Sequence, residues 1–299
     1  MNIPRPSAID AAYLDHFTGE DLRLLDPNWN GSDLERLPLA NGERLDDLLR
    51  SPQIFESVFM ASATGDPLLG ASPFFVFAVA VHRAASELDA TSYVSEWLGL
   101  GRRAPLFDVA RLRTFMAEPW HRLFLVELLA SYTRVSSGSV LVPTRRGFRR
   151  QRYSDLDPVR LAALLEVVPE AEWPGVLRRL GDLALFLTGV FPDHVARRGF
   201  GPIEEGRLLR SGGRGSDRAR PTGPGSPAVG DRGAVGLLEE LGRRWYRHAF
   251  DLLPRPVAAN VAILGELPER FDEARRMLGF ITERFLFPHR DSWFGISTT

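Results

Sequence analysis

The strongest constraint on the fold is a series of apolar segments that open with proline and repeat their apolar residues at helical spacing. Ser72 and Pro73 open one such segment, and Asp157 and Pro158 open another. A Ser or Asp that caps the first turn, followed by proline at the first helical position, is a common start of an α-helix. The pattern predicts an all-α fold built as a multi-helix, bundle-like domain.

Two further segments extend this prediction. Residues 119–134 are apolar over most of the helical circumference, so we expect that helix to be central. Residues 90–98 carry Tyr93, Val94 and Trp97 at helical spacing, and we expect a helix there as well. The longest uncharged apolar run, Pro67–Val81, has 15 residues. A bilayer span needs roughly 20, so this run predicts a buried core helix and no membrane span.

One stretch departs from the helical pattern. Ser139–Thr144 and Phe148–Ser154 are rich in β-branched or aromatic residues and flank a turn that contains Gly147. This arrangement predicts one small β-hairpin at about residues 139–154. Pro143 has no amide hydrogen to donate, which indicates an edge strand.

The predicted hairpin is also strongly basic. Five arginines lie there with no acidic residue among them: Arg145, Arg146, Arg149, Arg150 and Arg152. Arginine forks match carboxylate and phosphate oxygens, and Phe148 offers a ring for stacking. We therefore predict that these arginines and Phe148 bind a partner. The alternative is a solvated edge hairpin whose arginines discourage strand pairing or pair with the acidic N-terminal third.

Charge and composition divide the chain. Residues 1–100 hold 6 Arg and 15 acidic residues, whereas residues 101–232 hold 22 Arg and 14 acidic residues. Residues 211–233 contain 7 Gly and 3 Pro and almost no large apolar residue, which predicts a disordered linker. We expect a helical domain with the Arg-rich hairpin over 1–210, this linker, and C-terminal helices over 234–299 that pack back on the first part.

Asp182 is the most conspicuous polar residue within an apolar segment. A buried carboxylate needs a partner, and Arg178 and Arg179 lie four and three residues earlier on the same helix. One interpretation is a structural polar core of Asp182, Arg178 and Arg179. The other is a carboxylate aimed into a pocket. Asp182 is one catalytic candidate, and His194, which follows the Phe191-Pro192 helix stop, is the other.

Missing residue types exclude several chemistries. All 37 basic residues are arginine, and the chain has no cysteine. It therefore has no thiol nucleophile, disulfide or thiolate metal site, and no lysine for a Schiff base or a phosphate-binding loop. We predict no metal and no cofactor. The first residues lack the apolar core of a signal peptide, so we expect a cytoplasmic protein.

These observations leave three hypotheses for function. The first is a non-catalytic helical interaction or scaffold protein that contacts a protein partner through the Arg-rich hairpin or the acidic N-terminal third. The second is a small-molecule-binding protein or enzyme with a buried polar site at Asp182. The third is a nucleic-acid-binding protein that uses the hairpin arginines. We expect an interaction protein rather than an enzyme.

Overall fold

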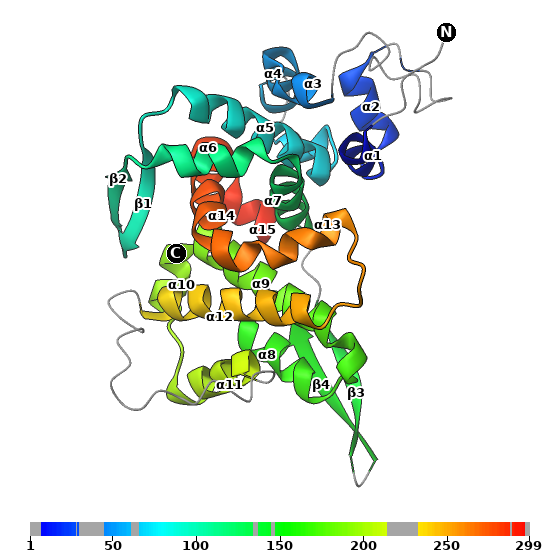
Figure 1. Cartoon of the computed structure of the whole chain (residues 1–299), viewed down its shortest axis with the longest axis vertical. Helices are drawn as coiled ribbons and strands as arrows, with labels where there is room; N and C mark the ends of the chain where they lie inside the picture. The colour runs from blue at the N-terminus through cyan, green and yellow to red at the C-terminus, as the bar shows by residue number, and fades with distance from the viewer. Residues whose placement is uncertain are drawn as a thin grey trace. The chain divides into compact units, whose positions relative to one another are not determined.

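The computed structural model describes residues 7–27, 29, 45–60, 66–133, 137–144, 147–213, 233–287 and 289–296. For residues 137–144, 147–153 and 259–260 it describes the backbone alone. The predicted all-α fold is confirmed, because helices account for most of these residues (Figure 1). Within the described ranges, no helix combines the length and the apolar character needed to cross a membrane.

The chain forms two compact units, each built from segments that are distant in sequence. The first unit comprises 1–94, 107–133 and 280–293, and the second comprises 95–106, 134–279 and 294–299. The described helices of the first unit are α1 (Ala8–Leu14), α2 (Gly19–Leu25), α3 (Leu45–Arg50), α4 (Pro52–Phe59), η3 (Pro67–Leu69), α5 (Pro73–Ala90), α6 (Val109–Ala117), α7 (Pro119–Ser131), η7 (Thr282–Leu286) and all but the last residue of α15 (Arg290–Phe294).

Helix α5 is the centre of the first unit. The Ser72 hydroxyl accepts a hydrogen bond from the Phe75 amide, and Pro73 occupies the first turn, as the sequence predicts. Helices α3, α4, α6 and α7 all pack against α5. Most of its side chains are buried, including Phe75 and Phe77. This helix therefore supplies the apolar core that the smaller helices cover.

The second unit carries the remaining elements. They are β1 (Val94–Gly99, except its first residue), β2 (Arg102–Leu106), β3 (Ser137–Thr144), β4 (Gly147–Ser154), α8 (Pro158–Ala162), η4 (Ala163–Glu166), η5 (Glu170–Glu172), α9 (Trp173–Val190), α10 (Pro192–Arg198), α11 (Pro202–Gly213), α12 (Gly233–Asp251), α13 (Ala259–Ala262), η6 (Ile263–Gly265) and α14 (Leu267–Ile281, except its last two residues).

Helices α9 and α12 form the main helix pair of this unit. Two glycines let them approach closely. A Cβ atom on Gly181 would lie 2.8 Å from the Tyr246 ring of α12, and one on Gly242 would lie 3.0 Å from the Ala184 Cβ of α9. Helix α11 ends at Gly213 and α12 begins at Gly233, so most of the predicted linker, residues 214–232, lies outside the described residues.

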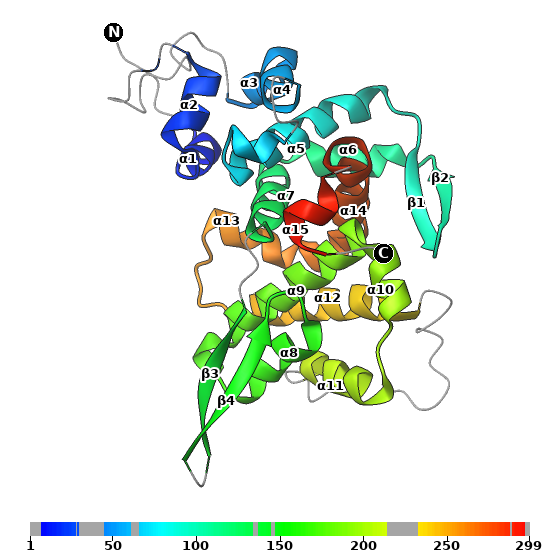
Figure 2. The ribbon, with the colours of Figure 1, turned by 180° about the vertical axis from the view of Figure 1, so that it is seen from behind.

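The predicted hairpin at 139–154 is confirmed as the antiparallel pair β3–β4. Both strands extend away from α8 and α9 in either view (Figure 2). The helix predicted over 90–98 is wrong, because residues from Val94 onward form a second hairpin, β1–β2. Gly101 adopts a left-handed φ of 63° in its turn. Glycine favours this backbone geometry, and the spacing of apolar residues alone gives no sign of such a turn.

Candidate functional site

Asp182 lies in the middle of α9 and is buried against α12. The Tyr246 hydroxyl donates a hydrogen bond to its Oδ1 at 2.8 Å. Arg178 Nε lies 3.8 Å from Oδ2, whereas Arg179 instead pairs with Asp155 at 3.4 Å. Asp182 therefore meets one of the two predicted arginines, and the nearer of its two partners here is a tyrosine 64 residues away.

The surroundings of Asp182 favour its neutral form. Burial raises the pKa of this carboxyl, and the Arg178 charge and the Tyr246 hydrogen bond counter only part of that rise. Asp182 is not among the residues that line the pocket described below. The contacts are those of a polar group that fixes the packing of two helices.

Replacing Asp182 by asparagine is expected to change the pH dependence of stability. The pKa of the unfolded carboxyl is close to the ordinary 3.8, and the folded value is higher. The stabilising contribution of this group is therefore fully present below 3.8 and is lost as pH rises through the folded value. The asparagine side chain cannot ionise, so the stability of the Asp182→Asn variant relative to the wild type should rise between acidic and neutral pH.

Urea unfolding of both proteins over a pH series measures this difference. A stability difference that stays constant with pH would show that Asp182 titrates alike in the folded and unfolded chains, contrary to the expectation.

Three of the predicted binding arginines belong to β4. Arg149 and Arg150 pair in register with Val142 and Leu141, and Arg152 pairs with Ser139. Phe148 pairs with Pro143. Arg145 and Arg146 lie outside the described residues. The hairpin thus holds three arginines and Phe148 on one strand, and their role in binding stays a prediction.

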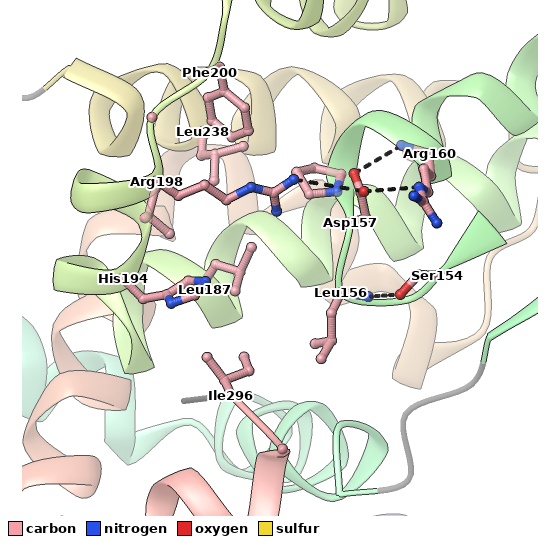
Figure 3. A pocket seen from close by; sticks show the side chains of 14 residues that line it. Ser154, Leu156, Asp157, Arg160, Leu187, His194, Arg198, Phe200, Leu238 and Ile296 are labelled. Carbon is pink, nitrogen blue, oxygen red and sulfur yellow. Dashed lines mark hydrogen bonds and ion pairs between the residues drawn. The ribbon is translucent and has the colours of Figure 1, made fainter. Parts of the chain in front are cut away.

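A pocket of about 480 Å³ opens in the second unit (Figure 3). Its walls come from the end of β4, from α8, α9, α10 and α12, and from the residues after α15. The apolar lining includes six side chains: Leu156, Leu187, Val195, Phe200, Leu238 and Ile296. The charged or polar lining consists of Ser154, Asp157, Arg160, His194 and Arg198.

Helix α10 carries two of these polar residues, because His194 and Arg198 are four positions apart and share one helix face. The neighbouring Asp193 holds the helix to the β1–β2 hairpin. Its Oδ1 accepts hydrogen bonds from Trp97 Nε1 at 2.8 Å and from the Gly101 amide at 3.2 Å. The catalytic candidate His194 lines the pocket, whereas Asp182, 12 residues earlier in the sequence, does not.

Sequence reasoning missed the other polar residues of the pocket. The sequence marks Asp157 only as a helix cap, and it does cap α8 by accepting from the Val159 and Arg160 amides. The spacing of His194 and Arg198 was the one signal that could have found part of the site. Their meeting with Asp157 depends on how α8 and α10 pack.

The first unit contains a different polar cluster, which the sequence did not suggest. His82 lies on α5, with its Nε2 3.0 Å from the Tyr13 hydroxyl and its Nδ1 2.8 Å from Asp46 Oδ1. The same carboxylate pairs with Arg122 at 3.0 Å and with Arg50 at 3.1 Å. Burial lowers the pKa of His82, and the Arg122 charge lowers it further, against the hydrogen bond to Asp46.

This cluster joins helices α1, α3, α5 and α7, so its hydrogen bonds and ion pairs hold these four helices together. No group of three His, Cys, Asp or Glu side chains in the described ranges is arranged to hold a metal ion.

No family model, curated protein or solved structure matches the chain.

Proposed function

We propose that this chain is a small-molecule-binding protein whose ligand occupies the pocket between α8, α10 and α12. The observation that carries the proposal is the cavity itself. Its volume of about 480 Å³ falls within the range of small-ligand sites, roughly 300–1,000 Å³. Such sites combine an apolar lining with a few convergent polar groups, and this pocket has both.

The state of His194 supports the same proposal. Within the described part of the chain, its imidazole has no hydrogen-bond or ion-pair partner, although it faces the pocket beside Leu187 (Figure 3). By contrast, the Tyr246 hydroxyl and Arg178 satisfy Asp182. We therefore keep the hypothesis of a small-molecule-binding protein, with the ligand in the pocket lined by His194 in place of a site at Asp182.

The other hypotheses from the sequence stay predictions. They include a protein or nucleic-acid partner at the Arg-rich hairpin, a protein partner at the acidic N-terminal third, and a cytoplasmic location.

A tryptophan that fills the pocket tests the proposal. Leu156 is half-buried on the pocket wall, so Leu156→Trp should place a large ring in the cavity. We expect the neutral fluorescent probe N-phenylnaphthylamine to bind the wild type and to lose affinity for this variant by about tenfold or more, equivalent to about 1.4 kcal/mol or more. Fluorescence titration, with excitation outside the tryptophan absorption band, measures the affinity.

The matched control is Ile203→Trp, because Ile203 lies in the same unit, is 74% exposed and does not line the pocket. It should leave the affinity of the probe unchanged. If Leu156→Trp fails to fold, Ile296→Trp fills the same cavity from the residues after α15. Absence of probe binding, or equal binding by filled and control variants, would contradict a ligand site here.

A further inference from the structure

The charged residues of the pocket restrict the class of ligand that it can bind. This inference rests on the proposed function. Asp157 is the only acidic side chain among the described lining residues. Its Oδ1 accepts the backbone amides of Val159 at 3.0 Å and Arg160 at 3.2 Å. Its Oδ2 faces Arg160 Nε at 3.3 Å and Arg198 Nη2 at 3.8 Å. This carboxylate is therefore already occupied, which leaves little for a cationic ligand to bind.

Arg198 is in the opposite state. Its separation of 3.8 Å from Asp157 is an ion-pair distance and exceeds that of a hydrogen bond. Its guanidinium makes no hydrogen bond within the described residues, and its side chain is 43% exposed. A guanidinium offers five N–H donors in a planar fork that matches two oxygens of one anionic group. Arg198 can therefore turn its donors to a ligand while it keeps a charged neighbour.

His194 adds a second group on the same helix face. A neutral imidazole donates from one ring nitrogen and accepts at the other, and a protonated one donates from both. In either state it can donate to an anionic oxygen. With Arg160, Arg198 and Asp157, the formal charge of the lining is one positive charge before His194 is counted. A ligand with one negative charge balances it.

The remaining surface of the pocket is apolar. In the view of Figure 3, Leu238 and Leu187 lie on either side of the Arg198 side chain, and Leu156 and Ile296 lie beyond Leu187. A small inorganic anion would leave this surface without contacts. An apolar body attached to the anionic group would bury it, with about 25 cal/mol gained per Å² of apolar surface removed from water.

We propose that the pocket binds an amphipathic monoanion, a carboxylate or a sulfonate on an apolar body, with Arg198 and His194 on the anionic group. Two matched probe sets test this on the full chain. Anilinonaphthalene sulfonate and N-phenylnaphthylamine differ by the sulfonate alone. Octanoate, octanol and octylamine have the same chain length and differ in the head group.

Octanoate is expected to displace N-phenylnaphthylamine at a concentration about tenfold lower than octanol or octylamine, since a hydrogen bond to a charged group contributes on the order of such a factor. The variant Arg198→Gln should lower the affinity for anilinonaphthalene sulfonate by a similar factor and leave that for N-phenylnaphthylamine unchanged. The control Arg197→Gln removes the same charge one residue away, outside the pocket lining, and should change neither affinity.

Three outcomes are distinguishable. The expected pattern supports the monoanion. Binding of N-phenylnaphthylamine in the pocket with octanol or octylamine equal to octanoate overturns the ligand class and leaves the proposed function standing. No binding of either probe overturns both. The head-group series uses the wild-type protein, so the result stands even where Arg198→Gln does not fold.

Discussion

Replacing Arg275 by leucine is expected to lower the free energy of unfolding by about 3–5 kcal/mol, because it removes a buried guanidinium that pairs with two buried carboxylates. Arg275 lies on α14 and its side chain is 4% exposed. Its Nε lies 3.0 Å from Glu239 Oε1 on α12, and its Nη2 donates to Glu96 on β1. Both glutamates are almost as deeply buried as the arginine.

The arginine is the centre of this cluster. Arg276 also reaches Glu96, at 2.7 Å from its Oε2, but is more exposed than Arg275. Burial works against the charge of Arg275, yet the charges of Glu239 and Glu96 outweigh it and raise the pKa of the guanidinium above its ordinary value. Without Arg275, Glu239 loses this ion pair, and Glu96 loses its pair with Arg275 while it keeps the pair with Arg276.

Urea unfolding followed by tryptophan fluorescence measures the loss, since Trp97 and Trp245 are both buried in the same unit. The control is Arg244→Leu, whose partner Glu240 lies at 2.9 Å with both side chains more than 40% exposed. Exposed pairs contribute less than about 1 kcal/mol. Equal losses for the two variants would show that the buried cluster holds no special share of the stability.

Replacing Asp46 by alanine is expected to destabilise the first unit by about 3 kcal/mol, the lower end of the range for a broken buried pair. The Asp46 carboxylate faces His82, Arg122 and Arg50 at distances from 2.8 to 3.1 Å. Arg122 is buried, and among the described residues it would then donate hydrogen bonds only to the carbonyl oxygens of Met116 and Ala117. We expect the lower end of this range of destabilisation because the Asp46 side chain is 31% exposed, so its charge is partly in contact with water.

Thermal melting of Asp46→Ala beside Asp47→Ala separates this effect from a loss of charge on α3. Asp47 is the next residue of the same helix and is exposed, so we expect a change below about 1 kcal/mol. Similar melting shifts for the two variants would contradict a central role for Asp46.

The same cluster predicts that acid weakens the first unit. Burial lowers the pKa of His82 below its ordinary 6.5. The pKa of Asp46 is also low: burial would raise it, but the hydrogen bond and charge of His82 and the charges of Arg122 and Arg50 outweigh that effect. The unfolded chain therefore binds protons more tightly at both groups. Stability is lost as pH falls below 6.5 at His82, and further below 3.8 at Asp46.

Much of the local structure follows from short stretches of sequence. Ser72 and Pro73 start α5, and β3 ends at Thr144 close to where β4 begins at Gly147, because caps, prolines and glycines act within a few positions. The helix expected over 90–98 failed for a related reason. Apolar residues at short spacing fit both a helix and a half-buried strand, and here the strand prevails, with the Trp97 indole hydrogen-bonded to Asp193.

The sequence by itself determined the all-α fold, the hairpin at 139–154 and the chemistries that a chain without lysine and cysteine cannot perform. Only the tertiary structure decided which polar groups meet. Tyr246 reaches Asp182 across 64 positions, and Arg275 reaches Glu96 across 179. The pocket likewise joins His194 and Arg198 to Asp157 and Ile296. Periodicity places a side chain on one face of its own helix, whereas its partner is set by the long-range packing of helices, which no local pattern specifies.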